Sequence, residues 1–236
     1  MRNAHTWTLP VLGPLLLLQG FYVRRVTPRL PEAEGPRTGI TGQGRPLRVL
    51  IAGDSAAAGV GALTQSQALS GQMSSLLEHH FQLSWLLEAT SGHTTLQAIE
   101  RLNKLPVQCF DIAVISLGVN DVTSGVRVST WIARLRKLEV LLTSRFQVGH
   151  VLLVALPPMH LFPALPQPLR WYLGERAALF NRELERYIHG NPICEIVRPN
   201  LHALSMAADG FHPSPEVFAA WAFTVAERIR VRLAEL

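Results

Sequence analysis

Short apolar runs alternate with segments of helical spacing from residue 47 to the end of this 236-residue chain. The apolar runs lack the strict polar alternation of half-exposed strands, which is typical of strands buried on both faces. Such strands form parallel sheets that helices cover on both sides, so we expect an α/β fold. The expected strands are 49–52, 82–89, 110–117, 148–156 and 194–197, and the expected helices are 64–81, 94–105, 129–146, 169–189 and one that begins after Ser214.

Four of the expected loops follow strands and contain residues suited to chemistry. Right-handed crossovers place all such loops at one edge of a parallel sheet, which is where open α/β sheets bind ligands. The loops are separated in sequence but are expected to converge in space. They contain Ser55, Gly92, the run 118–121 and the run 209–212.

The loop after the first strand presents Ser55 as a candidate nucleophile. Gly53 lets the backbone turn sharply, and the small residues that follow leave the serine side chain open to approach. An ordinary strand-to-loop turn explains this stretch equally well when it is taken alone. A phosphate-binding loop is disfavoured, because neither G-x-G-x-x-G nor a Gly-Lys-Ser/Thr ending is present.

A serine nucleophile needs a base and a means of stabilising the oxyanion. His212 can accept the proton of Ser55, and Asp209 can hold the other ring N–H of the histidine. The backbone N–H groups of Ser55 and Gly92 and the side-chain amide of Asn120 can donate to an oxyanion. Each of these residues also fits a structural role in a turn or at the surface. Their joint presence indicates acyl transfer.

The motifs resemble those of the SGNH/GDSL hydrolase family, in the family's order. The resemblance covers about residues 48–236 and implies a three-layer α/β/α sandwich with a parallel, flavodoxin-like sheet of about five strands. It also implies ester hydrolysis through an acyl-serine. The matching segments are Gly53-Asp54-Ser55, Gly92, Gly118-Val119-Asn120-Asp121 and Asp209-Gly210-Phe211-His212-Pro213.

By matching position, the resemblance implies a catalytic triad and an oxyanion hole. Ser55 would be the nucleophile, His212 the base and Asp209 the residue that orients the histidine. Gly92 and Asn120 would complete the oxyanion hole together with the amide of Ser55.

Two aspartates in the motifs and the stretch after the serine need an interpretation of their own. We interpret Asp54 and Asp121 as residues that shape their turns. After the serine the chain continues Ala56-Ala57-Ala58-Gly59, where the family often has a hydroxyl- or Leu-containing sequence. This departure leaves the triad untouched and weakens analogies to the plant and lipase branches.

The amino-terminal segment 1–26 is strongly apolar. It has no charged side chain between Arg2 and Arg24, and its length is near the about 17–25 residues of a membrane helix. Trp7 and Tyr22 bracket it like interfacial anchors, whereas its prolines weaken it as a spanning helix. A helix packed on the domain and a cleaved signal are the alternatives. We expect a membrane anchor, and the positive charges that follow it place the catalytic domain on the cytoplasmic side.

Two regions follow the expected anchor. Residues 27–46 contain four prolines and four glycines without periodicity, so we expect a linker there. Residues 47–236 are the expected hydrolase domain. Within it, the apolar segment 159–168 is expected either to line a substrate pocket or to pack as a loop on the core.

Charge and cysteine content exclude several function classes. The net charge of +5 comes from scattered residues without a basic helical face, so we expect no nucleic-acid partner, and an anionic membrane surface is the better candidate. Cys109 and Cys194 are far apart and adjoin apolar runs, which is typical of buried free thiols. The histidines and cysteines lack the spacing of metal ligands, so we expect neither a metal nor a cofactor.

The leading hypothesis is therefore a serine esterase without an obligate protein partner. The apolar segment 159–168 and the expected anchor favour a lipid-like or thioester substrate. Removal of acetyl groups from a carbohydrate or cell-envelope polymer is an alternative for the same site. A membrane-anchored binding or scaffold protein on a retired hydrolase fold is the alternative from another class.

Overall fold

The computed structural model of the chain describes residues 5–198 and 205–234, and for residues 5–11 it describes the backbone alone. Six strands of these residues form a sheet in the order β1-β3-β2-β4-β5-β6. The strands are β1 (Thr38–Thr41), β2 (Arg45–Gly53), β3 (Phe81–Ala89), β4 (Ile112–Ser116), β5 (His150–Val154) and β6 (Cys194–Val197). The α-helices are α1 (His5–Val26), α2 (Leu69–Leu77), α3 (Thr95–Leu102), α4 (Val119–Thr123), α5 (Val128–Phe146), α6 (Leu169–Ile188) and α7 (Pro215–Ala234), and η1 (Gln65–Gln67) and η2 (Met159–Leu161) are single 3₁₀ turns.

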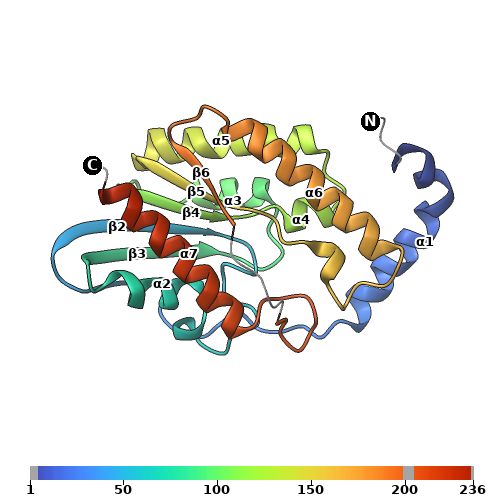
Figure 1. Cartoon of the computed structure of the whole chain (residues 1–236), viewed down its shortest axis with the longest axis horizontal. Helices are drawn as coiled ribbons and strands as arrows, with labels where there is room; N and C mark the ends of the chain where they lie inside the picture. Colours follow the sequence, from blue (N-terminus) through green and yellow to red (C-terminus); the bar gives the residue numbers. More distant parts are fainter. Residues whose placement is uncertain (1–4, 199–204, 235–236) are drawn as a thin grey trace.

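Strands β2 to β6 run parallel in a flavodoxin-like order. β2 pairs with β3 on one side and with β4 on the other, and β5 and β6 continue the sheet. β1 is antiparallel to β3 at the edge. Helices α2 and α7 cover one face, and α3, α5 and α6 cover the other (Figure 1). The expected α/β/α sandwich with a parallel sheet is confirmed.

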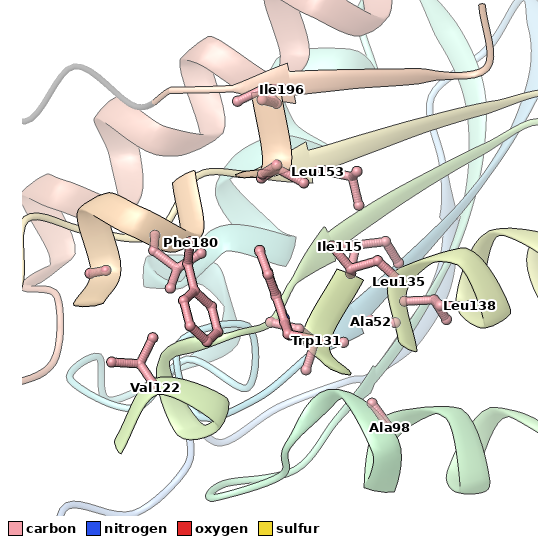
Figure 2. Close-up of a cluster of buried hydrophobic side chains, with 14 of the residues drawn as sticks. Ala52, Ala98, Ile115, Val122, Trp131, Leu135, Leu138, Leu153, Phe180 and Ile196 are labelled. Carbon is pink, nitrogen blue, oxygen red and sulfur yellow. The ribbon is translucent and has the colours of Figure 1, made fainter. Parts of the chain in front are cut away.

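The two faces of the sheet carry separate apolar cores, because successive strand side chains point to opposite sides. Leu50 and Ala52 of β2 belong to the core under α3, α5 and α6, whereas Val49 and Ile51 belong to the core under α2 and α7. The central strands are thus buried on both sides, which explains their continuous apolar sequences. Figure 2 shows the first core, with side chains from Ala52, Ile115, Leu153, Ile196, Trp131 and Phe180 among others.

The parallel register aligns the carboxyl ends of three strands. Gly53, the last residue of β2, pairs with Ala89 of β3 and with Ser116 of β4. The loops that follow these strands therefore leave the sheet side by side. This shared edge is where an open parallel sheet forms its binding crevice.

We expected residues 27–46 to form a linker without packed elements. The structure shows that this expectation was wrong. β1 lies in this range and pairs with residues 83–86 of β3. Ala33 is also buried, and its N–H donates to the carbonyl of Ala58 at 3.3 Å. A four-residue edge strand that contains Gly39 has little strand signal of its own, so its position is fixed by the pairing with β3.

Several predicted boundaries shift where the chain turns between layers. The expected helix 64–81 is divided into η1 and α2, and the chain has already entered β3 at Phe81. The expected strand 49–52 begins earlier, at Arg45, because β2 pairs with β3 along its whole length. The last helix begins at Pro215, as the sequence predicted.

α1 contains most of the segment that we expected to be a membrane anchor. No helix of the described residues has both the length and the apolar character to cross a membrane. α1 lies next to α6 at one end of the molecule (Figure 1). Its Leu16 and Val23 side chains are buried. The side chain of Gln19 donates to the carbonyl of Gln167 at 2.7 Å and accepts from the N–H of Leu169 at 3.1 Å.

Candidate active site

Three residues from two separate loops form a continuous hydrogen-bond chain at the carboxyl edge of the sheet. The Nε2 atom of His212 lies 2.9 Å from Oγ of Ser55, and its Nδ1 atom lies 2.5 Å from Oδ2 of Asp209. The serine follows β2, and the other two precede α7. The structure therefore brings the three residues of the predicted triad together, in the expected order.

The turn after β2 is built from residues without large side chains because it has no room for them. A Cβ atom on Gly53 would lie 2.5 Å from the carbonyl oxygen of Ser116. Ala57 and Ala58 are fully buried. A Cβ atom on Gly59, where φ is +84°, would lie 2.7 Å from the Cβ of Ala33. Packing thus explains why the chain departs from the common continuation of the motif at this point.

The loop that contains His212 docks directly on the loop that contains Ser55. A Cβ atom on Gly61 would lie 2.1 Å from the carbonyl oxygen of Pro213, so the two loops approach backbone to backbone. Oδ1 of Asp209 accepts the N–H groups of Phe211 and His212, each at 3.0 Å. These contacts fix the imidazole relative to the serine.

The charge state of Asp209 suits the orientation of His212. Burial alone would raise the pKa of this carboxyl, but the hydrogen bonds from His212 and Phe211 outweigh burial and lower the pKa below its ordinary value. An ionised Asp209 accepts the Nδ1–H of the imidazole. The Nε2 atom then carries the lone pair that faces Ser55.

The residues of the predicted oxyanion hole line a cavity that the triad also lines. Gly92 has φ of +80°, and a Cβ atom there would meet nothing within 4 Å, so its backbone faces open space. Gly92, Asn120 and Ser55 line the same cavity. The amide of Asn120 donates to Oδ2 of Asp54 and to the carbonyl of His93, each at 3.1 Å. Binding of an oxyanion therefore requires Asn120 to share or exchange one of these bonds.

Asp54 links the nucleophile turn to Asn120, a role that the sequence did not reveal. Its Oδ1 atom accepts the N–H of Ala56 at 3.1 Å, which agrees with the expected role in shaping the turn. Burial raises the pKa of Asp54 to about 7 against the lowering effect of that hydrogen bond, and the nearby charge of Asp121 adds to the rise.

Asp121 is fully buried and joins three helices behind the site. Its Oδ2 atom accepts the N–H and the hydroxyl of Thr95, and its Oδ1 atom accepts from Arg134, all at 2.8 Å. The hydroxyl of Thr95 in turn accepts from the indole N–H of Trp131 at 3.1 Å. This cluster ties the loop that carries Gly92 to α4 and α5, and nothing in the sequence pattern pointed to Arg134.

Two cavities meet at Ser55. The smaller, of about 410 Å³, extends under the segment after β5, and its wall includes Leu156, Phe162 and Trp221. Segment 159–168 was expected either to line a pocket or to pack on the core. Phe162 does both, because it lines the smaller cavity and its side chain is buried. The larger cavity, of about 970 Å³, runs past Gly92 to α1.

Other chemistry-bearing groups lie outside the site. Cys194 is buried, Cys109 is half-buried, and both thiols are free. Within the described ranges, no three potential metal ligands of the His, Cys, Asp and Glu types lie together.

Comparisons with known proteins agree with this geometry. The sequence model of the GDSL-like Lipase/Acylhydrolase family matches residues 51–220. No curated protein matches the chain. Among solved structures, the psychrotrophic esterase EstA from Pseudoalteromonas sp. is 18% identical with a TM-score of 0.61, covering 79% of this chain and 98% of that one.

Two further solved structures of similar fold carry carbohydrate esterase names. Est24, a carbohydrate acetylesterase from Sinorhizobium meliloti, is 21% identical with a TM-score of 0.60, and the match covers 78% of this chain and 99% of that one. Axe2, an acetylxylan esterase from Geobacillus stearothermophilus, is 18% identical with a TM-score of 0.58, with coverage of 79% and 95%. At these identities the likeness establishes the fold.

Proposed function

Since the chain belongs to the GDSL-like lipase/acylhydrolase family, an ester-hydrolysing family, we propose that it is a serine esterase that works through an acyl-Ser55 intermediate. The observation that carries the proposal is the unbroken chain from Ser55 through His212 to Asp209 at the sheet edge. Neither a metal nor an organic cofactor is needed for this chemistry.

In the acylation step, Ser55 transfers its hydroxyl proton to Nε2 of His212 while Oγ forms a bond to the ester carbonyl carbon. The carbonyl oxygen becomes an oxyanion that faces the backbone N–H groups of Ser55 and Gly92 and the amide of Asn120. Collapse of the tetrahedral intermediate breaks the bond to the leaving alkoxide. His212 donates its proton to that alkoxide, and an acyl-serine remains.

In the deacylation step, His212 takes a proton from a water molecule as that water attacks the acyl carbon. The bond between the carbon and Oγ of Ser55 then breaks, and the proton returns to Oγ. Asp209 stays ionised throughout and stabilises the imidazolium that forms in each half-reaction. Its lowered pKa supports this assignment.

The apolar walls of both cavities favour a lipid-like ester. The smaller cavity has Leu156, Phe162 and Trp221 in its wall, and the larger has Leu16 and Leu165. Apolar walls on both sides of Ser55 suit an ester whose acyl and alcohol parts are both bulky and apolar. The smaller cavity is also lined by His160, Asn181 and Arg198, so polar groups of an ester would find partners at those positions.

A second candidate is removal of acetyl groups from a carbohydrate, for which the same triad is sufficient. It is favoured by the fold shared with Est24 and Axe2, whose names identify them as carbohydrate esterases. Release of acetate from acetylated xylan or from an acetylated envelope polysaccharide would support this candidate over the lipid-like one.

The proposal is tested with the full chain on p-nitrophenyl acetate and p-nitrophenyl octanoate. We expect wild type to hydrolyse both esters and to prefer octanoate in kcat/KM, because the longer chain fills apolar space. Ser55→Ala and His212→Ala should lose about a thousandfold or more in kcat. Equal kcat/KM for the two esters would contradict the lipid-like substrate. A folded wild type without activity on either ester would point to a retired binding protein.

A further inference from the structure

α1 uses a narrow stripe for packing and leaves a broad apolar face uncovered. Leu16 and Val23 are buried, and Gln19 between them bonds to the start of α6. Around the remaining circumference, large apolar side chains are 43–68% exposed. They are Leu15, Leu17, Leu18, Phe21, Tyr22 and Val26, which we call the α1 apolar face. A surface helix that only completed a core would carry polar residues at these positions.

Positive charge is concentrated at one end of this face. Arg24 and Arg25 lie in the last turn of α1, and Arg29 follows three residues after the helix. All three side chains are exposed. An exposed apolar helical face beside clustered arginines is the pattern of helices that lie in the surface of an anionic bilayer.

The α1 apolar face is continuous with the cavity that reaches the nucleophile. Leu17 and Phe21 belong to the face and also line the larger cavity, together with Leu16 and Gly20. Ser55 and His212 line the inner part of the same cavity. A molecule that entered from the α1 side would therefore reach the triad within one cavity, whose outer wall includes apolar side chains of α1.

We propose that α1 lies in the surface layer of an anionic lipid bilayer and that the cavity behind it admits the ester of a membrane lipid to Ser55. α1 is not apolar enough to span a membrane, but it needs only to bury one face at the interface. The arginines would contact lipid phosphates, and Tyr22 would lie at the boundary between headgroups and acyl chains. The substrate part of this proposal rests on the proposed esterase function, whereas the binding part does not.

Binding is tested by cosedimentation of the full-length Ser55→Ala protein with phosphatidylcholine vesicles, with and without phosphatidylglycerol. We expect the protein to bind the anionic vesicles. Without phosphatidylglycerol, the binding affinity should fall about fivefold for each arginine that contacts a lipid phosphate. The double variant Leu18→Ser/Tyr22→Ser should bind about tenfold or more weakly, because it removes apolar area from the α1 apolar face. Neither residue lines the cavity.

The matched control is Val107→Ser/Val140→Ser, which changes two apolar side chains that are 69% and 63% exposed and lie outside α1. It should bind vesicles like the parent protein. In the active enzyme, the Leu18→Ser/Tyr22→Ser variant should keep hydrolysis of soluble p-nitrophenyl acetate and lose most hydrolysis of p-nitrophenyl octanoate presented in anionic vesicles. If the wild-type enzyme hydrolysed neither ester, the esterase proposal would be wrong. The membrane proposal would still be tested, because vesicle binding is measured separately.

Three results would overturn the membrane proposal. The first is absence of binding to anionic vesicles by the folded full chain. The second is equal binding by the Leu18→Ser/Tyr22→Ser variant and the valine control. The third is a stable dimer in sedimentation that this variant converts to monomer, which would identify a second copy of the chain as the partner of the α1 apolar face.

Discussion

At the scale of single residues, Asp54 connects the two halves of the active site. One carboxylate oxygen holds the turn of the nucleophile through Ala56, and the other holds the amide of Asn120. Because both bonds come from neutral donors, the buried carboxylate gains little to offset its loss of hydration. The site therefore contains a carboxyl group that changes protonation near neutral pH.

Asp54 should make the folded protein less stable as the pH rises. Its folded pKa of about 7 is above the ordinary value of 3.8, so the native state binds the extra proton between these values. The free energy of unfolding then falls with rising pH by up to about 1.4 kcal/mol per unit within this window. Asp54→Asn should reduce that slope, as measured by urea unfolding at several pH values.

The control for this prediction is Asp111→Asn. The pKa of Asp111 is lowered, with the hydrogen bonds and charge of Arg48 outweighing the effect of burial. Its contribution to the pH dependence therefore lies below pH 3.8, and the slope near neutral pH should not change. Identical slopes for wild type and Asp54→Asn would show that Asp54 does not titrate in this range.

Asn120 should contribute to the rate more than to substrate binding. Replacing it with alanine removes one oxyanion donor, so we expect kcat for p-nitrophenyl acetate to fall about a hundredfold or more with little change in KM. Asn103→Ala, at the exposed end of α3, is the matched control and should leave both constants unchanged. A kcat within about twofold of wild type for Asn120→Ala would remove this residue from the oxyanion hole.

At the scale of secondary-structure elements, Asp121 joins α3, α4 and α5 into one support for the oxyanion side. Its carboxylate is fully buried, and Arg134 beside it is 21% exposed. We expect Asp121→Ala to lower the free energy of unfolding by about 3 kcal/mol, because it leaves Thr95 and Arg134 without their acceptor. Chemical denaturation monitored by circular dichroism measures this change.

Asp111 again provides the comparison, since it also pairs with an arginine. Its side chain is 36% exposed and that of Arg48 is 50% exposed, so solvent screens the pair. Asp111→Ala should therefore cost about 1 kcal/mol or less. A loss of similar size in the two variants would mean that burial of Asp121 adds nothing to its ion pair.

The elements also indicate what a sequence can and cannot predict. The parallel strands and most helices were predictable because their patterns are local. β1 was not, since Gly39 leaves room for the ring of Trp85 in the neighbouring strand and gives no strand signal itself. The bond between Asp54 and Asn120 joins residues 66 positions apart, and the contact of Arg134 with Asp121 depends on how α5 packs. Such contacts follow from tertiary placement.

At the scale of the whole molecule, one edge of the sheet collects the functional loops. The motifs predicted that Ser55, Asp209 and His212 would meet, because strand-end loops of a parallel sheet converge there, and the structure brings them within hydrogen-bonding distance. The motifs did not predict that α1 would lie along the larger cavity. The apolar amino-terminal segment thus becomes part of the wall of the site.

The proposed esterase activity depends most directly on Ser55 being the nucleophile. Intact-mass spectrometry of the full chain after treatment with a fluorophosphonate tests this, because an activated serine oxygen displaces fluoride from the reagent and forms a stable bond to phosphorus. We predict a single adduct that peptide mapping places on Ser55, no adduct on Ser55→Ala, and much slower labelling of His212→Ala. An unlabelled but folded wild type, or equal labelling of Ser55→Ala, would contradict the account.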